Sequence, residues 1–332
     1  MLIPAIPEGM ARAGIIGANG ISGLMLAKLL GGSLRKIWVR DPNFDLRRAL
    51  YDPDLQVEMH LFDIMCLKDQ LEGLDVLFLA TPHELSMDIV AACGDICLKN
   101  AIRIIDLSGA FRLPVALFEK AYGMKHTAPE WLPYFSYGLM PWAKELTTPF
   151  VANPGCYATS GLMALLPLAK TVNLTNCVID AKSGATGAGR SLREELLFIE
   201  VADTCMPYRV GKHQHMAEIA HAMELFAGVQ IDFHFSTSLL PIKRGIVSAL
   251  YLSLLEEGAS LDAAYNAAYG HMAQAVRFGQ ADRHMLSLEG VVGTNRTHIG
   301  YEVIGKKVYV FSCIDNMIKG AAGQSIENME RV

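Results

Sequence analysis

The sequence lacks the features that mark export, membrane insertion or nucleic-acid binding. No uninterrupted apolar run approaches the roughly 20 residues that span a bilayer, although 52% of the 332 residues are hydrophobic and only 19% are charged. The segment from Met1 to Ala11 has no basic residue ahead of its apolar stretch, so it does not have the layout of a secretion signal. A net charge of −5 without a dense basic tract argues against a nucleic-acid surface. We therefore expect a cytoplasmic globular protein that binds neither nucleic acid nor membrane.

Cysteine is present but not in pairs. The seven cysteines are an odd number without paired spacings, which fits a reducing compartment better than a disulfide framework. Cys93 and Cys97 are four residues apart and could share a metal on one helix face, but no second Cys/His pair has a matching spacing. We expect core packing for both cysteines and no metal site.

What the sequence does contain is a series of short apolar segments separated by stretches long enough for helices. Such alternation predicts a parallel sheet with crossover helices, whose ligand lies at the carboxyl ends of the strands. A chain of 332 residues also favours two domains over one. The expected strands of the first domain are Ala13 to Ile16, Lys36 to Val39, Val76 to Ala80 and Ile102 to Leu107.

The second half of the chain has longer strand-like segments that lie further apart, which favours an α+β domain. Its expected strands are Cys177 to Ala181, Ile231 to Leu240, Ile246 to Leu255 and Lys307 to Ile314, and its expected helices are Arg190 to Ala202 and Leu261 to Val276. The fold class is thus α/β: a Rossmann-type doubly wound parallel sheet plus a second α+β domain with a mixed, partly antiparallel sheet. We expect residues 1–152 to form the first domain, completed by a C-terminal helix within 316–332, and residues 153–315 to form the catalytic and dimerisation domain.

A glycine turn follows the first expected strand and precedes a helical pattern. Glycines at 17, 20 and 23 are spaced for a tight turn, for close approach to a pyrophosphate and for helix-to-strand contact. Ala18 stands where the strict motif has glycine, and a purely structural turn would give the same pattern. The expected cofactor-binding residues here are Gly17, Asn19, Gly20, Ile21, Ser22 and Gly23.

The residue after the second expected strand bears on the choice of cofactor. NAD sites usually place a carboxylate there, whereas NADP sites use a cation for the 2′-phosphate. Arg40 follows Val39, with Arg47 and Arg48 nearby. We interpret this as an NADP site with Arg40 as the partner, while Asp41 keeps the NAD alternative open and a solvated arginine cluster is a further one.

Cys156 lies between a Pro-Gly turn and a helix-forming run, Ser160 to Lys170. The first N–H groups of a helix carry partial positive charge, which stabilises a thiolate and lowers the thiol pKa. A cysteine so placed can attack a carbonyl. The alternative is a small buried residue at a strand-to-helix junction.

The segment from Tyr208 to Ile219 gathers histidines, cations and a carboxylate. Histidine titrates near neutrality, so it can take a thiol proton and later return one. The spacing does not decide whether His213 or His215 does so, and one of the two is expected to be structural. Tyr208, in the same segment, is a candidate substrate-binding residue.

Two further loops follow expected strands. The glycine-rich stretch from Lys182 to Ser191 could hold phosphate or the nicotinamide end of a cofactor, with Ser183 toward substrate and Gly184 toward cofactor, although a surface loop is nearly as good an interpretation. Arg112 follows another strand and could hold an oxyanion through two parallel hydrogen bonds.

With these residues assembled, the chain resembles the N-acetyl-γ-glutamyl-phosphate reductases of arginine biosynthesis, a family within the aspartate-semialdehyde dehydrogenase superfamily. Six segments carry the resemblance in order, over nearly the whole length: residues 17–23, 106–113, 153–159, 183–190, 213–219 and 315–324. The family usually has an acidic residue where this chain has Ala110, proline at Ala158 and Ala217, and leucine at Met317.

The resemblance implies an NADPH-dependent reduction of an acyl phosphate through a thioester on Cys156. It implies that His213 or His215 is the acid/base, that Arg112 lies near the substrate's anionic groups, and that Asn316 lies near the nicotinamide. It also implies a homodimer or homotetramer. The alternatives are aspartyl phosphate or carrier-linked aminoadipyl phosphate as substrate, or a nucleotide-binding regulator without catalysis, for which Cys156 would be dispensable.

Overall fold

The computed structural model describes residues 11–143, 146–189, 194 and 197–331. They fall into two compact units. One ends at Gly155 and resumes at Ala321 for the C-terminal helix, and the other spans Cys156–Gly320. The boundaries between the units, after Gly155 and after Gly320, therefore lie three and five residues beyond the expected boundaries at 152 and 315. Asn153 belongs with the first unit because its backbone N–H donates to Asp106 O at 2.8 Å, and Gly320 belongs with the second because its N–H donates to Asp315 O at 2.9 Å.

The first unit contains a seven-stranded sheet in the order β3-β2-β1-β4-β5-β7-β6, and all its strand pairs are parallel. This confirms the predicted doubly wound sheet. The central strands are apolar because both faces are covered, and every residue of β1 and β4 is buried. The strands are β1 (Ala13–Ile16), β2 (Leu34–Val39), β3 (Glu58–Leu61), β4 (Val76–Leu79), β5 (Arg103–Asp106), β6 (Phe135–Tyr137) and β7 (Phe150–Ala152).

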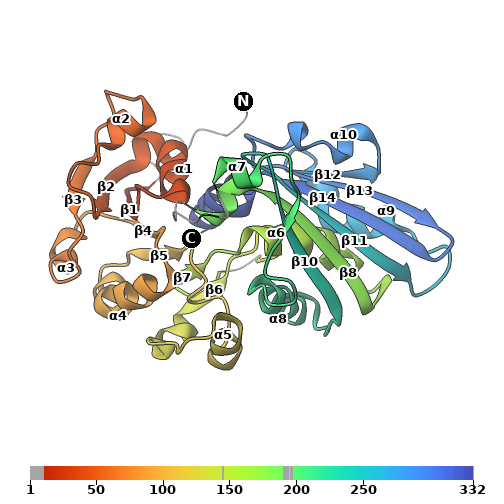
Figure 1. Ribbon diagram of the computed structural model, residues 1–332. Coiled ribbons are helices and arrows are strands. Elements are labelled where there is room, and N and C mark those ends of the chain that lie inside the picture. The colour runs from red at the N-terminus through yellow and green to blue at the C-terminus, as the bar shows by residue number, and fades with distance from the viewer. Residues whose placement is uncertain (1–10, 144–145, 190–193, 195–196, 332) are drawn as a thin grey trace. The chain divides into compact units, whose positions relative to one another are not determined.

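Helices connect these strands (Figure 1). The longest, α4, begins directly after Pro82 and buries a face that includes Cys93 and Cys97. Burial raises the pKa of the Cys93 thiol to about 11 and that of Cys97 to about 12, so both serve as core residues, as expected. The helices of this unit are α1 (Ile21–Leu30), α2 (Leu46–Leu50), α3 (Leu67–Gln70), α4 (His83–Lys99), α5 (Val115–Tyr122) and α11 (Gly323–Glu330), with 3₁₀ turns at Gly31–Ser33 and Pro129–Tyr134.

The second unit contains another seven-stranded sheet, in the order β12-β13-β14-β11-β8-β10-β9. The pairs β8/β10 and β12/β13 are parallel and the others are antiparallel, which confirms the predicted mixed sheet. Its strands are β8 (Val172–Gly184), β9 (Met206–Pro207), β10 (Phe233–Leu240), β11 (Ile246–Leu254), β12 (Val276–Gln280), β13 (Thr297–Ile304) and β14 (Lys307–Ile314).

One face of this sheet is covered by α6, which packs on β8, β11, β13 and β14. The strands alternate accordingly: Leu250 is buried, whereas the next residue, Tyr251, is 42% exposed. The longer helices of the unit are α6 (Cys156–Leu165), α8 (His215–Ala227) and α9 (Leu261–Tyr269). Shorter elements are α7 (Phe198–Val201), α10 (Arg283–Leu286), and 3₁₀ turns at Leu166–Leu168, Ala185–Ala188, Gly270–Met272 and Leu288–Gly290. The π-helical turn η8 (Ile318–Ala322) begins in this unit and ends in the first.

Several expected elements have different bounds. The helix predicted over Leu261 to Val276 ends at Tyr269, because Val276 begins β12 and pairs with β13, a strand the sequence did not reveal. In the helix predicted over Arg190 to Ala202, residues 190–193 and 195–196 lie outside the described residues, and Phe198–Val201 is helical. Across the described ranges, no helix is both long and apolar enough to cross a membrane.

Candidate active site

The glycine turn between β1 and α1 is built by close approach. Gly17 has a φ of +90°, and a Cβ atom there would lie 2.5 Å from Ala80 O. A Cβ atom at Gly23 would lie 2.2 Å from Gly17 O. Gly20 forms the N-cap of α1, where no side chain makes a capping hydrogen bond. The N–H groups that open this helix, at Ile21 and Ser22, therefore offer an anion site at its positive end.

A pocket of about 210 Å³ opens beside this turn. Arg40 lines it from the end of β2, exposed to solvent. The neighbouring Asp41 carboxylate accepts the Asn43 N–H at 2.9 Å, while Arg47 donates to Leu55 O at 3.0 Å and so holds a loop. The other lining residues are Ile16, Gly17, Asn19, Gly20, Trp38, Val39, Phe62, Ala80, Thr81, Pro82 and Leu85. A glycine cradle, an open helix N-terminus and a cation at the strand end together fit a nicotinamide dinucleotide.

Arg112 in the first unit is almost fully buried, and its guanidinium holds backbone. Its Nε donates to Asn153 O at 2.7 Å and its NH2 donates to Leu107 O at 2.8 Å. Asp106 lies nearby, and burial raises the pKa of its carboxyl, although hydrogen bonds from Ser86 and Ser108 oppose that shift. Arg112 thus fixes the backbone directly after β7, three residues before Cys156. Its expected role beside the substrate stays a prediction.

Asn153 is held from its side chain as well. Asn328 of α11 donates to Asn153 Oδ1 at 2.9 Å, and Asn153 Nδ2 donates to Ala321 O at 3.2 Å. The Asn-Pro-Gly segment before Cys156 is therefore anchored at its first residue.

In the second unit, α6 begins at Cys156 itself, four residues before the helix-forming run that was expected to start at Ser160. Cys156 is partly exposed, whereas the other nine residues of α6 are buried. The thiol therefore stands at the positive end of a helix whose remainder is fixed in the core.

His213 is enclosed by aromatic rings. The ring centroids of Tyr157, Tyr208 and Phe235 lie 5.3, 5.8 and 5.7 Å from that of His213, each edge-on. Burial, with the nearby charges of His215 and Arg209, lowers the pKa of His213 to about 2. Its Nδ1 accepts the His215 backbone N–H at 3.1 Å, so the proton of this neutral ring belongs on Nε2.

His215 opens α8 and meets a buried carboxylate. Its Nε2 lies 3.8 Å from Glu218 Oε2, one turn further along the helix, and the Glu218 side chain is 2% exposed. The His215 ring centroid is 4.6 Å from that of His213 and 6.0 Å from that of Tyr157, the residue after Cys156. A histidine next to an acidic partner can hold or release a proton, whereas a histidine neutral to pH 2 cannot.

The other predicted residues of this unit lie around the same helix. Tyr208 donates to the Tyr157 hydroxyl at 3.1 Å, and burial raises the pKa of Tyr208 to about 12. Ser183 is buried at the end of β8, where its hydroxyl donates to Gly184 O at 3.0 Å. Gly184 packs against the loop before β11, because a Cβ atom there would lie 2.7 Å from Arg244 N.

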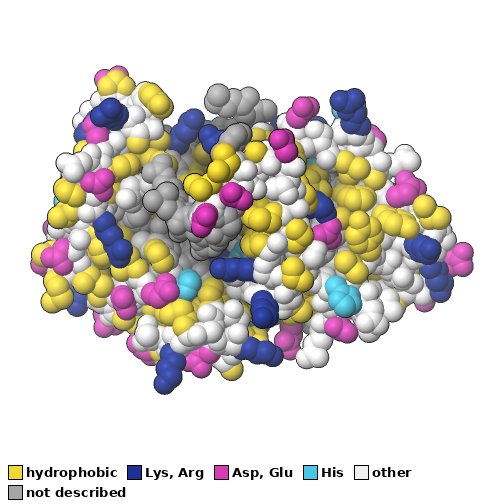
Figure 2. Space-filling model, in the orientation of Figure 1, with side chains coloured by type: hydrophobic (Ala, Val, Ile, Leu, Met, Phe, Trp, Pro, Cys, Tyr) yellow, Lys and Arg dark blue, Asp and Glu magenta, His cyan; other side chains and the backbone are white. Residues whose placement is uncertain are grey.

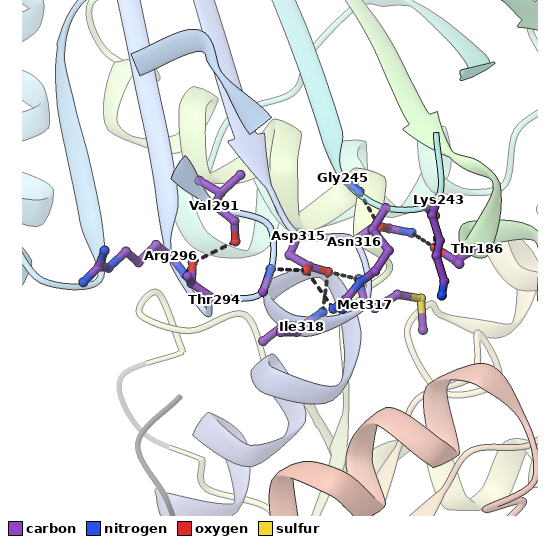
Figure 3. A network of polar contacts seen from close by, with 12 residues as sticks. Thr186, Lys243, Gly245, Val291, Thr294, Arg296, Asp315, Asn316, Met317 and Ile318 are labelled. Atoms are coloured by element: carbon purple, nitrogen blue, oxygen red, sulfur yellow. Dashed lines mark hydrogen bonds and ion pairs between the residues drawn. The ribbon is translucent and has the colours of Figure 1, made fainter. Parts of the chain in front are cut away.

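Asn316 joins two loops rather than projecting alone (Figure 3). Its Oδ1 accepts the Gly245 N–H at 2.8 Å and its Nδ2 donates to Thr186 Oγ1 at 3.0 Å. The preceding Asp315 is completely buried and lies 2.7 Å from the Arg244 guanidinium. Sequence reasoning assigned no individual role to Asp315, Arg244 or Glu218. Only Glu218 left a signal, a carboxylate three positions after a histidine on one helix face.

Comparisons with known proteins agree with this architecture. The semialdehyde dehydrogenase NAD binding domain matches residues 12–145, and the semialdehyde dehydrogenase dimerisation domain matches residues 156–316. N-acetyl-gamma-glutamyl-phosphate reductase of Streptococcus thermophilus (strain CNRZ 1066) is 33% identical over 96% of this chain and 94% of that protein. The protein of that name from Ruthia magnifica is 34% identical over the same shares.

Solved structures of aspartate semialdehyde dehydrogenases share the fold. The Vibrio cholerae aspartate semialdehyde dehydrogenase II complexed with ASA has a TM-score of 0.66 at 14% identity and covers 96% of this chain and 97% of its own. The Francisella tularensis enzyme has a TM-score of 0.63 at 15% identity and covers 97% of this chain and 100% of its own. The chain belongs to the semialdehyde dehydrogenase family of oxidoreductases, with a nicotinamide-dinucleotide-binding domain and a dimerisation domain.

Proposed function

We propose that the chain reduces N-acetyl-γ-glutamyl phosphate to N-acetylglutamate semialdehyde and phosphate, with NADPH as the reductant. The relatives that match along 96% of the chain are named for this reaction. The observation that carries the chemistry is the arrangement in the second unit. Cys156 opens α6, and the next residue, Tyr157, packs against both His213 and His215.

The nucleophile is Cys156. The N–H groups at the start of α6 favour the thiolate, whose sulfur attacks the acyl carbon of the substrate. A C–S bond forms, the bond between the acyl carbon and the phosphate oxygen breaks, and phosphate leaves with the bonding electrons. The same N–H groups stabilise the oxyanion of the tetrahedral intermediate, an effect worth about 3 kcal/mol per donor in comparable sites.

The acid/base is His215, and His213 positions it. Neutral His215 takes the Cys156 proton before attack, and the Glu218 carboxylate faces the imidazolium that this forms. The imidazolium returns its proton to sulfur when the aldehyde leaves. His213 accepts the His215 backbone N–H and stays neutral, so it fixes the first turn of α8 without taking part in proton transfer.

NADP binds the first unit at the glycine turn. The bound dinucleotide supplies the hydride that reduces the thioester carbon. Gly17, Asn19 and Gly20 line the pocket that would hold it, and the N–H groups of Ile21 and Ser22 would bind the pyrophosphate, while Gly23 allows the helix to pack closely. Arg40 pairs with the 2′-phosphate. Gly184 and Asn316 are assigned to the nicotinamide on the resemblance, and Asn316 holds the loop after Gly184 through its hydrogen bond to Thr186.

Cofactor choice can be tested at Arg40. Arg40→Ala should raise KM for NADP at least tenfold while KM for NAD changes little, because only NADP carries the 2′-phosphate. Arg48→Ala is a matched control from the same exposed cluster. An unchanged NADP preference in Arg40→Ala would exclude this assignment.

The substrate's anionic groups are assigned to Arg112, Tyr208 and Ser183. The hydrogen bonds that Arg112 donates to Asn153 O and Leu107 O fix the orientation of its guanidinium. Ala110 is buried, and its carbonyl oxygen lies 2.9 Å from His126 Nε2. The position that is acidic in the family is thus part of the core here, and it bears on which acyl phosphate is preferred.

We further propose a homodimer formed through the face of the second sheet opposite α6. Tyr251 of β11 pairs with Val178 of β8 on one side and with Tyr309 of β14 on the other. The ring centroids of Tyr251 and Tyr309 lie 6.0 Å apart in an edge-on arrangement. Figure 2 shows hydrophobic side chains gathered over these strands. Tyr251→Lys should convert the oligomer to monomer in sedimentation experiments. Ile199 is also exposed but lies on α7 rather than on this sheet, so the control variant Ile199→Lys should leave the oligomer intact.

The reaction is tested in the oxidative direction. Phosphate-dependent reduction of NADP is followed by absorbance with N-acetylglutamate semialdehyde, aspartate semialdehyde and the carrier-linked aminoadipate semialdehyde, for wild type and Cys156→Ser. Turnover of the first aldehyde alone, lost in Cys156→Ser while NADP still binds, is the expected result. Turnover of only one of the other aldehydes would change the assigned substrate but leave the proposed mechanism intact. Near-normal turnover by Cys156→Ser would overturn the mechanism.

A further inference from the structure

Gly320 lies directly against the residue that serves as nucleophile. A Cβ atom at position 320 would lie 2.7 Å from Cys156 Cβ and 3.2 Å from Cys156 Cα. The first distance is shorter than carbon atoms tolerate. Rotation of the cysteine side chain cannot relieve it, because Cα and Cβ do not move with χ1. Glycine is therefore required here by the approach of another backbone.

Gly320 belongs to η8, a π-helical turn over Ile318–Ala322. Such turns are rare and occur often at functional sites. In this chain the turn brings the 320 backbone to the first residue of α6.

The turn is anchored by Asp315 (Figure 3). The Asp315 carboxylate accepts the N–H groups of Met317 at 2.8 Å and Ile318 at 3.1 Å, and the Gly320 N–H donates to Asp315 O at 2.9 Å. The carboxylate is completely buried and paired with Arg244 at 2.7 Å. Because breaking this pair would leave the buried carboxylate uncompensated, the turn is held in place.

A third atom stands at the edge of ordinary contact. The hypothetical Cβ atom at 320 would also lie 3.4 Å from Ile314 Cδ1, the mobile end of a side chain on β14. This contact can be removed by shortening the side chain, which gives a way to restore room at the turn without touching Cys156.

We propose that Gly320 is a positioning residue for Cys156. The absence of a side chain at 320 lets the anchored turn hold Cα and Cβ of Cys156 at the start of α6, so that the sulfur stays at the helix N-terminal N–H groups. The proposal rests on the proposed function only in taking Cys156 as the nucleophile. A shift of about 1 Å in a reacting group can reduce a rate on the order of a hundredfold.

Gly320→Ala is the test, with two readouts. The first is the rate at which iodoacetamide alkylates Cys156 between pH 5 and 10, resolved by mass spectrometry of the peptide that contains it. The second is the pair of constants kcat and KM. We expect slower alkylation with its midpoint at higher pH and a kcat reduced roughly ten- to hundredfold. KM for the acyl phosphate and the Kd for NADP should stay within about twofold of wild type, since the change misplaces sulfur without removing a binding contact.

Two glycines provide matched controls. A Cβ atom at Gly279 of β12 would meet nothing within 4 Å, and one at Gly161 of α6 would meet its nearest atoms at 3.6 and 4.0 Å, which is ordinary contact. Gly279→Ala and Gly161→Ala should keep wild-type alkylation and turnover. Gly161→Ala in particular controls for an alanine added to the same helix.

A double variant tests the geometry. Gly320→Ala with Ile314→Val opens space beside the new Cβ atom, into which the turn can shift away from Cys156. The double variant should regain part of the lost alkylation rate and kcat, which a general loss of stability would not predict. If Gly320→Ala does not fold, the double variant is measured in its place. Wild-type alkylation in either folded variant, or failure of both to fold, would overturn the proposal and leave Gly320 a packing residue. Because alkylation needs no substrate, it reports on Gly320 even if the proposed substrate is wrong.

Discussion

Acid should destabilise the native protein through His213, whose side chain is buried. Its pKa is lowered from 6.5 to about 2 by burial among aromatic rings. In the unfolded chain the same imidazole takes up a proton below pH 6.5. The unfolded state therefore binds more protons than the native state, so the contribution of His213 to stability is complete above pH 6.5 and is lost as pH falls toward 2.

The size of the effect follows from this linkage. Between pH 7 and pH 5, a histidine that stays neutral in the native state lowers the free energy of unfolding by roughly 2 kcal/mol, because the unfolded chain takes up the proton. The value is the same for any native pKa below about 4. His213→Asn is the matched variant. The Asn Oδ1 can accept the His215 N–H as Nδ1 does, at 3.1 Å in the native protein, but it does not titrate. His213→Ala removes both the acceptor and the titration.

Urea unfolding at pH 7 and pH 5 measures the difference. Wild type should lose about 2 kcal/mol more than His213→Asn over this range. Nitrogen NMR of the imidazole should show a neutral ring at pH 5, with the proton on Nε2. His213→Asn should keep kcat within about tenfold of wild type, while His215→Asn should lose at least about a hundredfold. A protonated His213 at pH 5, or equal activity losses in the two Asn variants, would refute the assignment of roles.

Three further predictions concern buried groups. Glu218→Gln removes the charge facing His215 Nε2 at 3.8 Å and should lower kcat about ten- to hundredfold with little change in KM, as measured by steady-state kinetics; an unchanged kcat would separate Glu218 from catalysis. Gly23→Ala places a Cβ atom 2.2 Å from Gly17 O, so NADP titration should show weaker binding in this variant and normal binding in Gly279→Ala. Asp315→Asn breaks the buried pair with Arg244 and should destabilise the protein by about 3–5 kcal/mol in thermal unfolding; a change below about 1 kcal/mol would contradict the anchoring role.

Local patterns predicted the parts of the fold that depend on local residues. The strand Ala13–Ile16 and the strand Lys307–Ile314 have the bounds that their apolar runs indicated, because each is a short segment limited by turn residues. The edge strand β3 was not among the expected strands. It has only four residues, and its two apolar ones, Met59 and Leu61, are exposed rather than part of a buried apolar run. Val276 was assigned to a helix because its partner β13 is distant in sequence.

The candidate site shows the same division. Cys156, the glycine turn and the histidine segment stand out because each combines reactive or permissive residues within a few positions, and their roles stay predictions. Spacing alone left His213 and His215 equivalent. What separates them is their surroundings: three rings from β10, α6 and the segment before α8 enclose His213, while Glu218 faces His215.

The sequence by itself determined the fold class, the family and the residues capable of the chemistry, because those follow from short-range periodicity and from motifs in order along the chain. The tertiary structure alone decided that Gly320 contacts Cys156 across 164 positions, that Asp315 pairs with Arg244, and that His213 is desolvated. The physical reason is that burial and close approach are set by which distant segments pack together, and these in turn set charge state and position.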